Sequence, residues 1–137
     1  MTREDFCNLL ADTKAKIGLT TTDISFDMRM QLSTLNRLEK GKTNFSVQKI
    51  IEYVKCLKAN LCLYKKNKST KIYEYDDVIS FIKKARKGIY SQRDLAKEIG
   101  CTHSTIANIE SNISIVSIDV FLKILEVLGY ELKIESI

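Results

Sequence analysis

Apolar side chains in the second half of the chain recur every three or four residues, a spacing that predicts amphipathic helices. We expect the first of these helices to begin with Asp76 or Asp77 as its N-cap. Its inward positions are apolar: Val78, Ile79, Phe81, Ile82, Ala85 and Ile89. Its outward positions are basic: Lys83, Lys84, Arg86 and Lys87. This division predicts one face in the core and one in solvent.

A capping box marks the start of the next helix, because the hydroxyl of Ser91 and the carboxylate of Asp94 stand three positions apart. Gly100 is expected to end this helix, since glycine accepts the positive φ of a tight turn. Thr102 then caps a third helix that reaches about Glu110. The inward residues of both helices are small or apolar: Leu95, Ala96, Ile99, Ile106 and Ile109.

Ser117 caps a fourth helix, after which the apolar spacing changes to two. The core positions of this helix are Ile118, Phe121, Leu122, Leu125 and Leu128. Tyr130, Leu132 and Ile134 then alternate with charged residues. This alternation predicts a short strand over residues 130–135.

The first half of the chain carries the same pattern 71 residues earlier. Thr20 and Asp23 form a capping box that matches the one at Ser91, and no gap is needed from there to Ser46, the counterpart of Ser117. Further matches are Leu35 with Ile106, Leu38 with Ile109, and Glu39 with Glu110. The first helix matches at an offset of 72, so one residue has been gained or lost near residue 88. The repeat predicts two related units of roughly 60 residues.

A second short strand is expected at residues 61–64, the place that matches the strand at 130–135. Because a lone strand is unstable, we expect the two strands to pair with each other or with a second chain. Antiparallel pairing within the chain would relate the two units by a pseudo-two-fold axis.

Composition is that of a folded globular protein, with 45% hydrophobic and 28% charged residues, so a disordered chain is not expected. The N-terminus lacks the apolar run of a signal peptide, and no stretch approaches the roughly 18 apolar residues of a membrane span. We therefore expect a cytoplasmic protein that does not contact a membrane.

Cysteine and histidine do not form the pattern of a metal site or an enzyme. The four cysteines, Cys7, Cys56, Cys62 and Cys101, contain no C-x-x-C pair, so buried thiols are expected rather than zinc ligands or disulfides. His103 is the only histidine, and its neighbour Ser104 points away from it on a helix, which does not suit nucleophilic catalysis. We expect no metal, no cofactor and no enzymatic activity.

The net charge of +5 is unevenly distributed. Lys and Arg outnumber Asp and Glu by 10 to 7 in residues 1–63 and by 4 to 1 in residues 64–75, whereas residues 76–137 hold 8 against 9. The lysines of residues 64–75 stand among Asn, Ser and Thr, which is typical of a solvated connector; the alternative is an arm that contacts phosphate. A positive field supports nucleic-acid binding only beside a fold that presents it to DNA.

The segment from Ser91 to Glu110 closely resembles the helix-turn-helix of the phage repressor and Cro family, also called XRE-like. Ala96 matches the small residue that lets the two helices of this motif approach, and Gly100 matches the glycine of the turn. Glu110 matches the acidic residue that ends the recognition helix. The resemblance covers residues 76–130 well.

Residues 3–60 resemble the family more loosely. Ser25 replaces the small alanine, and Arg29 stands at the turn glycine, where it must adopt an unfavourable backbone conformation unless the turn is rebuilt. The segment 39–42, Glu-Lys-Gly-Lys, keeps the basic loop of the family, whereas the segment 110–113 does not.

The resemblance implies a mainly α fold with two tandem lambda-repressor-like helix-turn-helix domains of about four helices each, each followed by a short β-strand. The divergent first domain would span residues 1–63 and the basic linker residues 64–75. The second domain, with its C-terminal strand, would span residues 76–137.

In this family the third helix lies in the major groove, and the start of the second helix contacts a phosphate. Carried over by position, the base-contacting candidates are Gln31, Leu32, Ser33, Arg37, Thr102, His103, Ser104 and Asn108. The phosphate-contacting candidates are Thr21, Lys40, Lys42 and Gln92. Glutamine suits adenine, arginine suits guanine, and leucine suits the methyl group of thymine. The alternatives are solvated positions for Ser104 and Asn108, and packing against a partner protein for Leu32.

These observations favour a transcriptional regulator, such as a repressor, that binds double-stranded DNA sequence-specifically with two non-identical recognition helices about 34 Å apart. The chain is then an intramolecular pseudo-dimer, and homodimerisation of the whole chain stays open. The alternative is an antitoxin-like or other protein-interaction module in which one or both helix-turn-helix surfaces bind a toxin-like partner. The acidic balance of residues 76–137 and the apolar stretch 113–118 favour that alternative.

Overall fold

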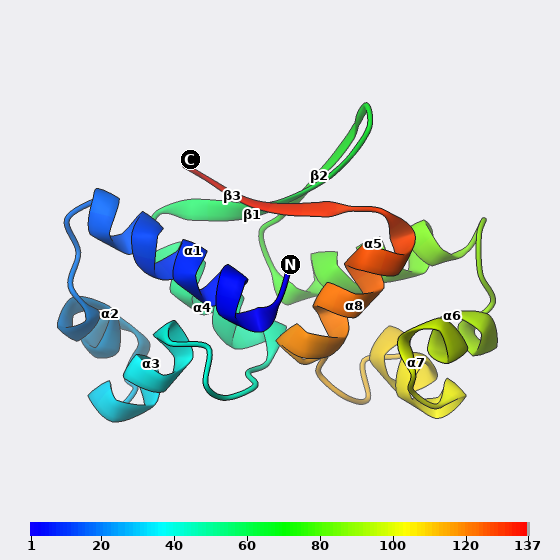
Figure 1. Ribbon diagram of the computed structural model, residues 1–137, viewed down its shortest axis with the longest axis horizontal. Coiled ribbons are helices and arrows are strands. Elements are labelled where there is room, and N and C mark those ends of the chain that lie inside the picture. Colours follow the sequence, from blue (N-terminus) through cyan, green and yellow to red (C-terminus); the bar gives the residue numbers. More distant parts are fainter. Residues whose placement is uncertain (137) are drawn as a thin grey trace.

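A computed structural model describes residues 1–136, which form eight helices and a small antiparallel sheet (Figure 1). The elements are α1 (Arg3–Lys16), α2 (Thr21–Met28), α3 (Leu32–Glu39), α4 (Val47–Cys56), β1 (Ala59–Lys65), β2 (Lys68–Ile72), α5 (Tyr75–Arg86), α6 (Gln92–Ile99), α7 (His103–Glu110), α8 (Ile118–Leu128) and β3 (Glu131–Ser136). None of these helices is long and apolar enough to cross a membrane.

Hydroxyl side chains begin most of the helices, as their spacing predicts. Ser46 and Ser117 cap α4 and α8, and Thr20 forms a complete capping box with Asp23 at the start of α2. At α6 only one of the two bonds of the capping box is present. The Ser91 hydroxyl accepts the backbone N–H of Asp94, but the Asp94 side chain does not bond back to the N–H of Ser91. The first turns of these helices are therefore held by the side chains that the sequence places there.

The start and end of α5 differ from the prediction. Its N-cap is Glu74, not Asp76 or Asp77, because Asp77 at the third helical position accepts the backbone N–H of Glu74 at 3.0 Å. The helix ends at Arg86, so Ile89 lies beyond it with 55% of its surface exposed rather than in the core. Arg86, predicted to face outward, is instead buried.

The turns between the paired helices both use the left-handed conformation. Gly100 has φ 76°, as predicted, and Arg29 has φ 53° at the matching position. A non-glycine residue in this region costs about 1 kcal/mol. The hydroxyl of Ser25 donates to the carbonyl of Met30 at 2.7 Å and so holds the strained turn closed.

The sheet has the strand order β2-β1-β3, with antiparallel neighbours throughout. The predicted pairing of residues 61–64 with residues 130–135 is confirmed by the register of β1 and β3. The basic segment 64–75 is not an irregular connector, because it forms the end of β1, a turn and the edge strand β2. Most of its side chains are exposed, since only one face of an edge strand packs on the protein.

The pairing of β1 with β3 matches each half of the chain to the other by the same 71-residue offset as the sequence repeat. Cys62 pairs with Lys133, and an isolated bridge pairs Ser46 with Ser117; both pairs join residues 71 positions apart. An antiparallel pair that joins a residue to its own counterpart lies on the two-fold axis that relates them. The neighbouring pairs Leu61 with Ile134 and Leu63 with Leu132 exchange under the same rotation. The two halves are therefore paired as in a two-fold dimer.

One hydrophobic cluster runs through both halves of the chain. Two backbone hydrogen bonds flank the bridge between Ser46 and Ser117. The N–H of Val47 donates to the carbonyl of Val116 at 2.9 Å, and the N–H of Ile118 donates to the carbonyl of Phe45 at 2.7 Å. These bonds and the shared core hold the halves against each other.

The four cysteines are free thiols. Cys7 and Cys62 are buried, and burial raises the pKa of each to about 11, so both are protonated at neutral pH. Cys56 and Cys101 are half-buried.

Candidate nucleic-acid interface

The two predicted recognition helices, α3 and α7, lie on the same side of the molecule, opposite the sheet and toward opposite ends of its long axis (Figure 1). Each is preceded by a helix of the same length, α2 or α6, that packs against it. The candidate base-contacting residues therefore belong to one edge of the molecule.

At the start of α7, Thr102, His103 and Ser104 are exposed, whereas Asn108, one turn further on, is half-buried. Thr102 is the N-cap, and its hydroxyl accepts the backbone N–H of Thr105 at 3.3 Å. Its hydroxyl also lies 3.0 Å from that of Ser104. His103 and Ser104 are therefore exposed at the start of this helix, and the hydroxyl of Ser104 is held beside that of Thr102.

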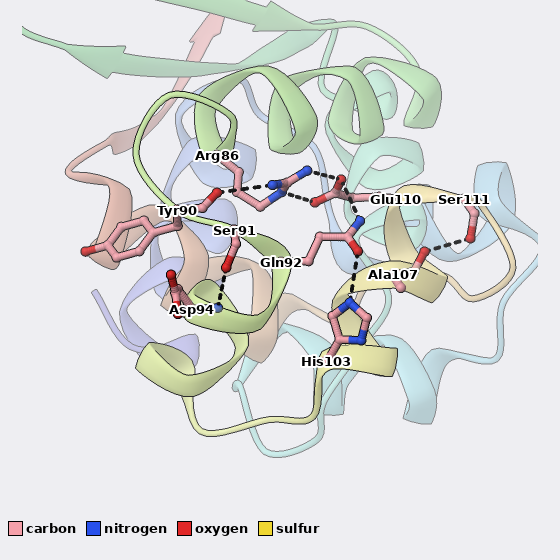
Figure 2. Close-up of polar contacts among 9 residues, drawn as sticks. All are labelled: Arg86, Tyr90, Ser91, Gln92, Asp94, His103, Ala107, Glu110 and Ser111. Carbon is pink, nitrogen blue, oxygen red and sulfur yellow. Dashed lines mark hydrogen bonds and ion pairs between the residues drawn. The ribbon is translucent and has the colours of Figure 1, made fainter.

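A buried ion pair between Arg86 and Glu110 lies on the far side of Gln92 from His103 (Figure 2). Arg86 donates to both carboxylate oxygens of Glu110, from Nε at 2.6 Å and from Nη2 at 2.8 Å, and its third nitrogen, Nη1, donates to the carbonyl of Tyr90 at 3.1 Å. Only 10% of the Arg86 side chain and 4% of the Glu110 side chain are exposed. This bidentate pair ties the end of α5 to the end of α7.

Gln92 connects the ion pair to the surface (Figure 2). Its Nε2 donates to Glu110 at 3.2 Å, and its Oε1 lies 3.2 Å from Nε2 of His103. The contact with His103 is a hydrogen bond when that nitrogen carries the proton. The first residue of α6 therefore fixes the orientation of a candidate base-contacting residue on α7.

The first half has a related cluster around Glu39, the counterpart of Glu110. Thr21, which matches Gln92, donates to Glu39 at 2.7 Å, and Tyr53 donates to its other oxygen at 2.6 Å. Lys14, which matches Arg86 at the offset of 72, lies 2.9 Å from the same carboxylate. Burial opposes ionisation of Glu39, but these hydrogen bonds outweigh it and lower its pKa. Glu39 is therefore a charged anchor for α3.

On α3 the candidate base-contacting residues, Gln31, Leu32, Ser33 and Arg37, are all exposed. Gln31 occupies the N-cap but makes no capping bond with its side chain, so its amide is available to an external partner. Leu32 has 45% of its surface exposed, so its side chain can contact an external partner. The surface of α3 thus offers an amide, a guanidinium and an apolar side chain.

The loops after α3 and α7 both have a left-handed residue at the matching position, but their side chains differ. Gly41 has φ 67°, and a Cβ there would lie 2.8 Å from Cα of Glu4, so the close approach requires glycine. Its counterpart Asn112 has φ 60°. Lys40 and Lys42 are exposed around Gly41, whereas the match to Lys42 in the second half is Ile113, which is 74% exposed. Positive charge in one loop is replaced by an apolar surface in the other.

Sequence reasoning missed three residues of these clusters: Lys14, Tyr53 and Arg86. Arg86 follows Ile79 and Ile82 at helical spacing, so the apolar stripe itself places it on the inward face of α5. A charge at a core position needs a buried partner. Glu110 also falls on an inward face, so it is the carboxylate that the sequence offers as this buried partner.

The phosphate-contacting candidates are of two kinds. Lys40 and Lys42 extend into solvent, whereas Thr21 and Gln92 are half-buried and belong to the two carboxylate clusters. Within residues 1–136, no three His, Cys, Asp or Glu side chains are arranged to hold a metal ion.

Comparison with known proteins gives one family match. Residues 82–134, from the middle of α5 to β3, match the family model described as helix-turn-helix. No curated protein and no solved structure matches the chain significantly. The chain therefore contains, at residues 82–134, a helix-turn-helix of the XRE family, a DNA-binding family whose members are typically not enzymes.

Proposed function

We propose that this protein is a transcriptional regulator that binds double-stranded DNA sequence-specifically, with α3 and α7 as two non-identical recognition helices in neighbouring major grooves. The chain then comprises two tandem helix-turn-helix domains, residues 1–63 and 76–137. Residues 64–75 connect them.

The observation that carries the proposal is the register of the two halves. Pairing of Cys62 with Lys133 and of Ser46 with Ser117 sets the halves about a two-fold axis, as in a symmetric dimer on an operator. The common side occupied by α3 and α7 supports simultaneous contact with one face of a duplex. We expect a separation near one DNA turn, about 34 Å.

The chemistry of the two surfaces supports an asymmetric operator. Gln31 and Arg37 suit adenine and guanine, and Leu32 suits a thymine methyl group. The second surface presents His103 and Ser104 instead, so the two half-sites need not share a sequence. Basic loop residues exist only on the first side, where Lys40 and Lys42 are exposed. Phosphate contacts should therefore be stronger around α3.

Selection of binding sites from a random duplex pool tests this proposal. Arg37→Ala should relax the preference at one position of the selected site, and His103→Ala should relax a different position about one turn away, each by about 1–3 kcal/mol of discrimination. Lys16→Ala is the charge control, because Lys16 is exposed at the end of α1 and belongs to neither α3 nor α7. A pool that returns no consensus contradicts the proposal, and relaxation by only one variant assigns base reading to one half.

One observation favours the second candidate, a protein-interaction module of the antitoxin type. Ile113 and Ile115, beside α7, are 74% and 51% exposed, and apolar side chains gathered on a surface indicate a protein contact. The salt dependence of binding to random duplex separates the two functions. A regulator loses affinity steeply as salt rises, because phosphate contacts release counterions. The absence of measurable duplex affinity at low salt contradicts the regulator and favours the protein-interaction module.

A further inference from the structure

A groove of about 830 Å³ lies between the β1–β2 hairpin and α5. The hairpin projects from the side of the molecule opposite α3 and α7, and neither of those helices lines the groove (Figure 1). Its volume falls in the range of ligand-binding sites. The groove is therefore a second candidate site, separate from the recognition helices.

One wall of the groove is the edge of β2. Five consecutive residues, 67–71, line it. Because side chains of a strand alternate between two faces, consecutive lining residues indicate that the groove follows the edge of the strand rather than one face. In the part of the chain that the structure describes, β2 pairs only with β1, so its outer edge leaves backbone N–H and C=O groups without a strand partner.

The opposite wall is one face of α5, since Asp77, Phe81, Lys84 and Ala85 recur at helical spacing along it. A strand edge that faces a helix is the geometry in which an extended peptide adds to a sheet. The five residues of β2 span about 16 Å, which accommodates about five residues of an added strand.

The positive charge of the groove favours an acidic ligand. Lys65, Lys68, Lys71 and Lys84 line it, and none of them forms an ion pair within residues 1–136. The lining carboxylate, Asp77, already accepts the backbone N–H groups of Tyr73 and Glu74. The groove thus has a surplus of positive charge.

Apolar side chains contribute to the same lining. Phe81 is buried, and Ile89, which also lines the groove, is 55% exposed. An occupant that alternates acidic and apolar residues would meet both the lysines and this apolar surface, because the side chains of an extended peptide alternate in direction.

We propose that the groove between β2 and α5 binds an extended acidic segment of a partner protein, which adds to the β2 edge as a fourth strand. A free edge about five residues long distinguishes this occupant from a compact phosphate ligand, which makes no use of a row of backbone groups. The proposal is independent of DNA binding by α3 and α7.

Selection from a random peptide pool, followed by nuclear magnetic resonance on the full chain, tests the proposal. Selected peptides should be enriched in Asp and Glu and should shift the backbone amide signals of residues 68–71. Two versions of the best peptide, methylated at one or the other set of alternate backbone nitrogens, should differ. Only one set donates to the strand edge, so its methylation should abolish binding, whereas methylation of the other set should leave binding largely intact. Equal binding of both methylated peptides, or shifts confined to another surface, overturns the proposal.

Matched charge reversals give a second readout. Lys68→Glu combined with Lys84→Glu changes one exposed lysine on each wall and should weaken the selected peptide roughly tenfold. Lys16→Glu combined with Lys123→Glu makes the same change in net charge outside the groove and should leave peptide affinity within about twofold. Equal effects of the two pairs overturn the proposal.

Two further outcomes identify a different occupant. If no acidic peptide is selected while inorganic tripolyphosphate or duplex DNA shifts the amide signals of residues 68–71, the groove is a phosphate site and the proposal fails. Duplex selection on the Lys68→Glu, Lys84→Glu protein should return the wild-type consensus, so the failure of this proposal and that of the proposed DNA function are distinguishable.

Discussion

Removal of one partner of the Arg86–Glu110 pair should strongly destabilise the protein. In Glu110→Ala the guanidinium of Arg86, whose side chain is 10% exposed, loses both carboxylate bonds and keeps only the carbonyl of Tyr90. An uncompensated buried charge of this kind costs about 3–5 kcal/mol. For a chain of this size that corresponds to a fall in Tm of roughly 10–20 °C.

The double variant Arg86→Met, Glu110→Leu separates the value of the ion pair from the penalty of breaking it. Two apolar side chains of similar size leave no buried charge, so most of the stability lost in Glu110→Ala should return. Duplex binding should not return with it, because Gln92 loses the oxygen that holds it beside His103.

Urea unfolding followed by circular dichroism gives the free energy of unfolding of both variants. An equal dependence of this free energy on urea concentration shows that both expose the same surface on unfolding. Two results would refute the reasoning: a cost below about 1 kcal/mol for Glu110→Ala, or a double variant no more stable than the single one. The first result would mean that Arg86 reaches water once Glu110 is gone. The second would mean that an unpaired buried charge is not what destabilises Glu110→Ala.

Three more predictions follow from the first half of the chain. Arg29→Gly should raise the free energy of unfolding by about 1 kcal/mol, because glycine relieves the φ of 53°; unchanged stability in urea unfolding would show that the turn is unstrained. Glu39 has a lowered pKa, so its ionised form adds stability above its ordinary pKa of 4.5, and this stability is lost as pH falls through the lower folded-state pKa. Glu39→Gln should therefore lose most stability at neutral pH and little at acidic pH, which thermal melts across pH will measure; a uniform loss would argue against it. Lys40→Ala with Lys42→Ala should reduce the slope of log affinity for DNA against log salt by about two, and an unchanged slope would remove both from the phosphate contacts.

The helices could be predicted because their signals are local. Ser46, Thr20 and Ser117 cap helices where a hydroxyl precedes an apolar periodic run, and Gly100 ends one where positive φ is needed. The pairing of β1 with β3 followed from the repeat, since the two predicted strands occupied matching places.

Other features could not be predicted, because distant partners decide them. The strand β2 is rich in lysine and exposed on an edge, so its sequence resembles that of a solvated connector. The apolar stripe of α5 places Arg86 inward, but its buried partner Glu110 lies 24 residues away along the chain. The N-cap of α5 is a local exception, because Glu74 is bonded to Asp77 only three residues on but is not a residue type that usually caps a helix. The base-contacting and phosphate-contacting roles stay predictions, since they depend on how a DNA duplex docks against these exposed side chains.

Because the two paired halves belong to one chain, dilution cannot separate them, and a substitution in one half is not repeated in the other. A dimer assembled from separate subunits falls apart as its concentration drops, and it forms mixed pairs when a variant subunit is present. Here the partner of Cys62 is Lys133 of the same molecule, so the paired halves meet at a fixed effective concentration. A substitution in one half alters one of the two surfaces and leaves the other as it was, so each surface is free to diverge without the loss of its partner.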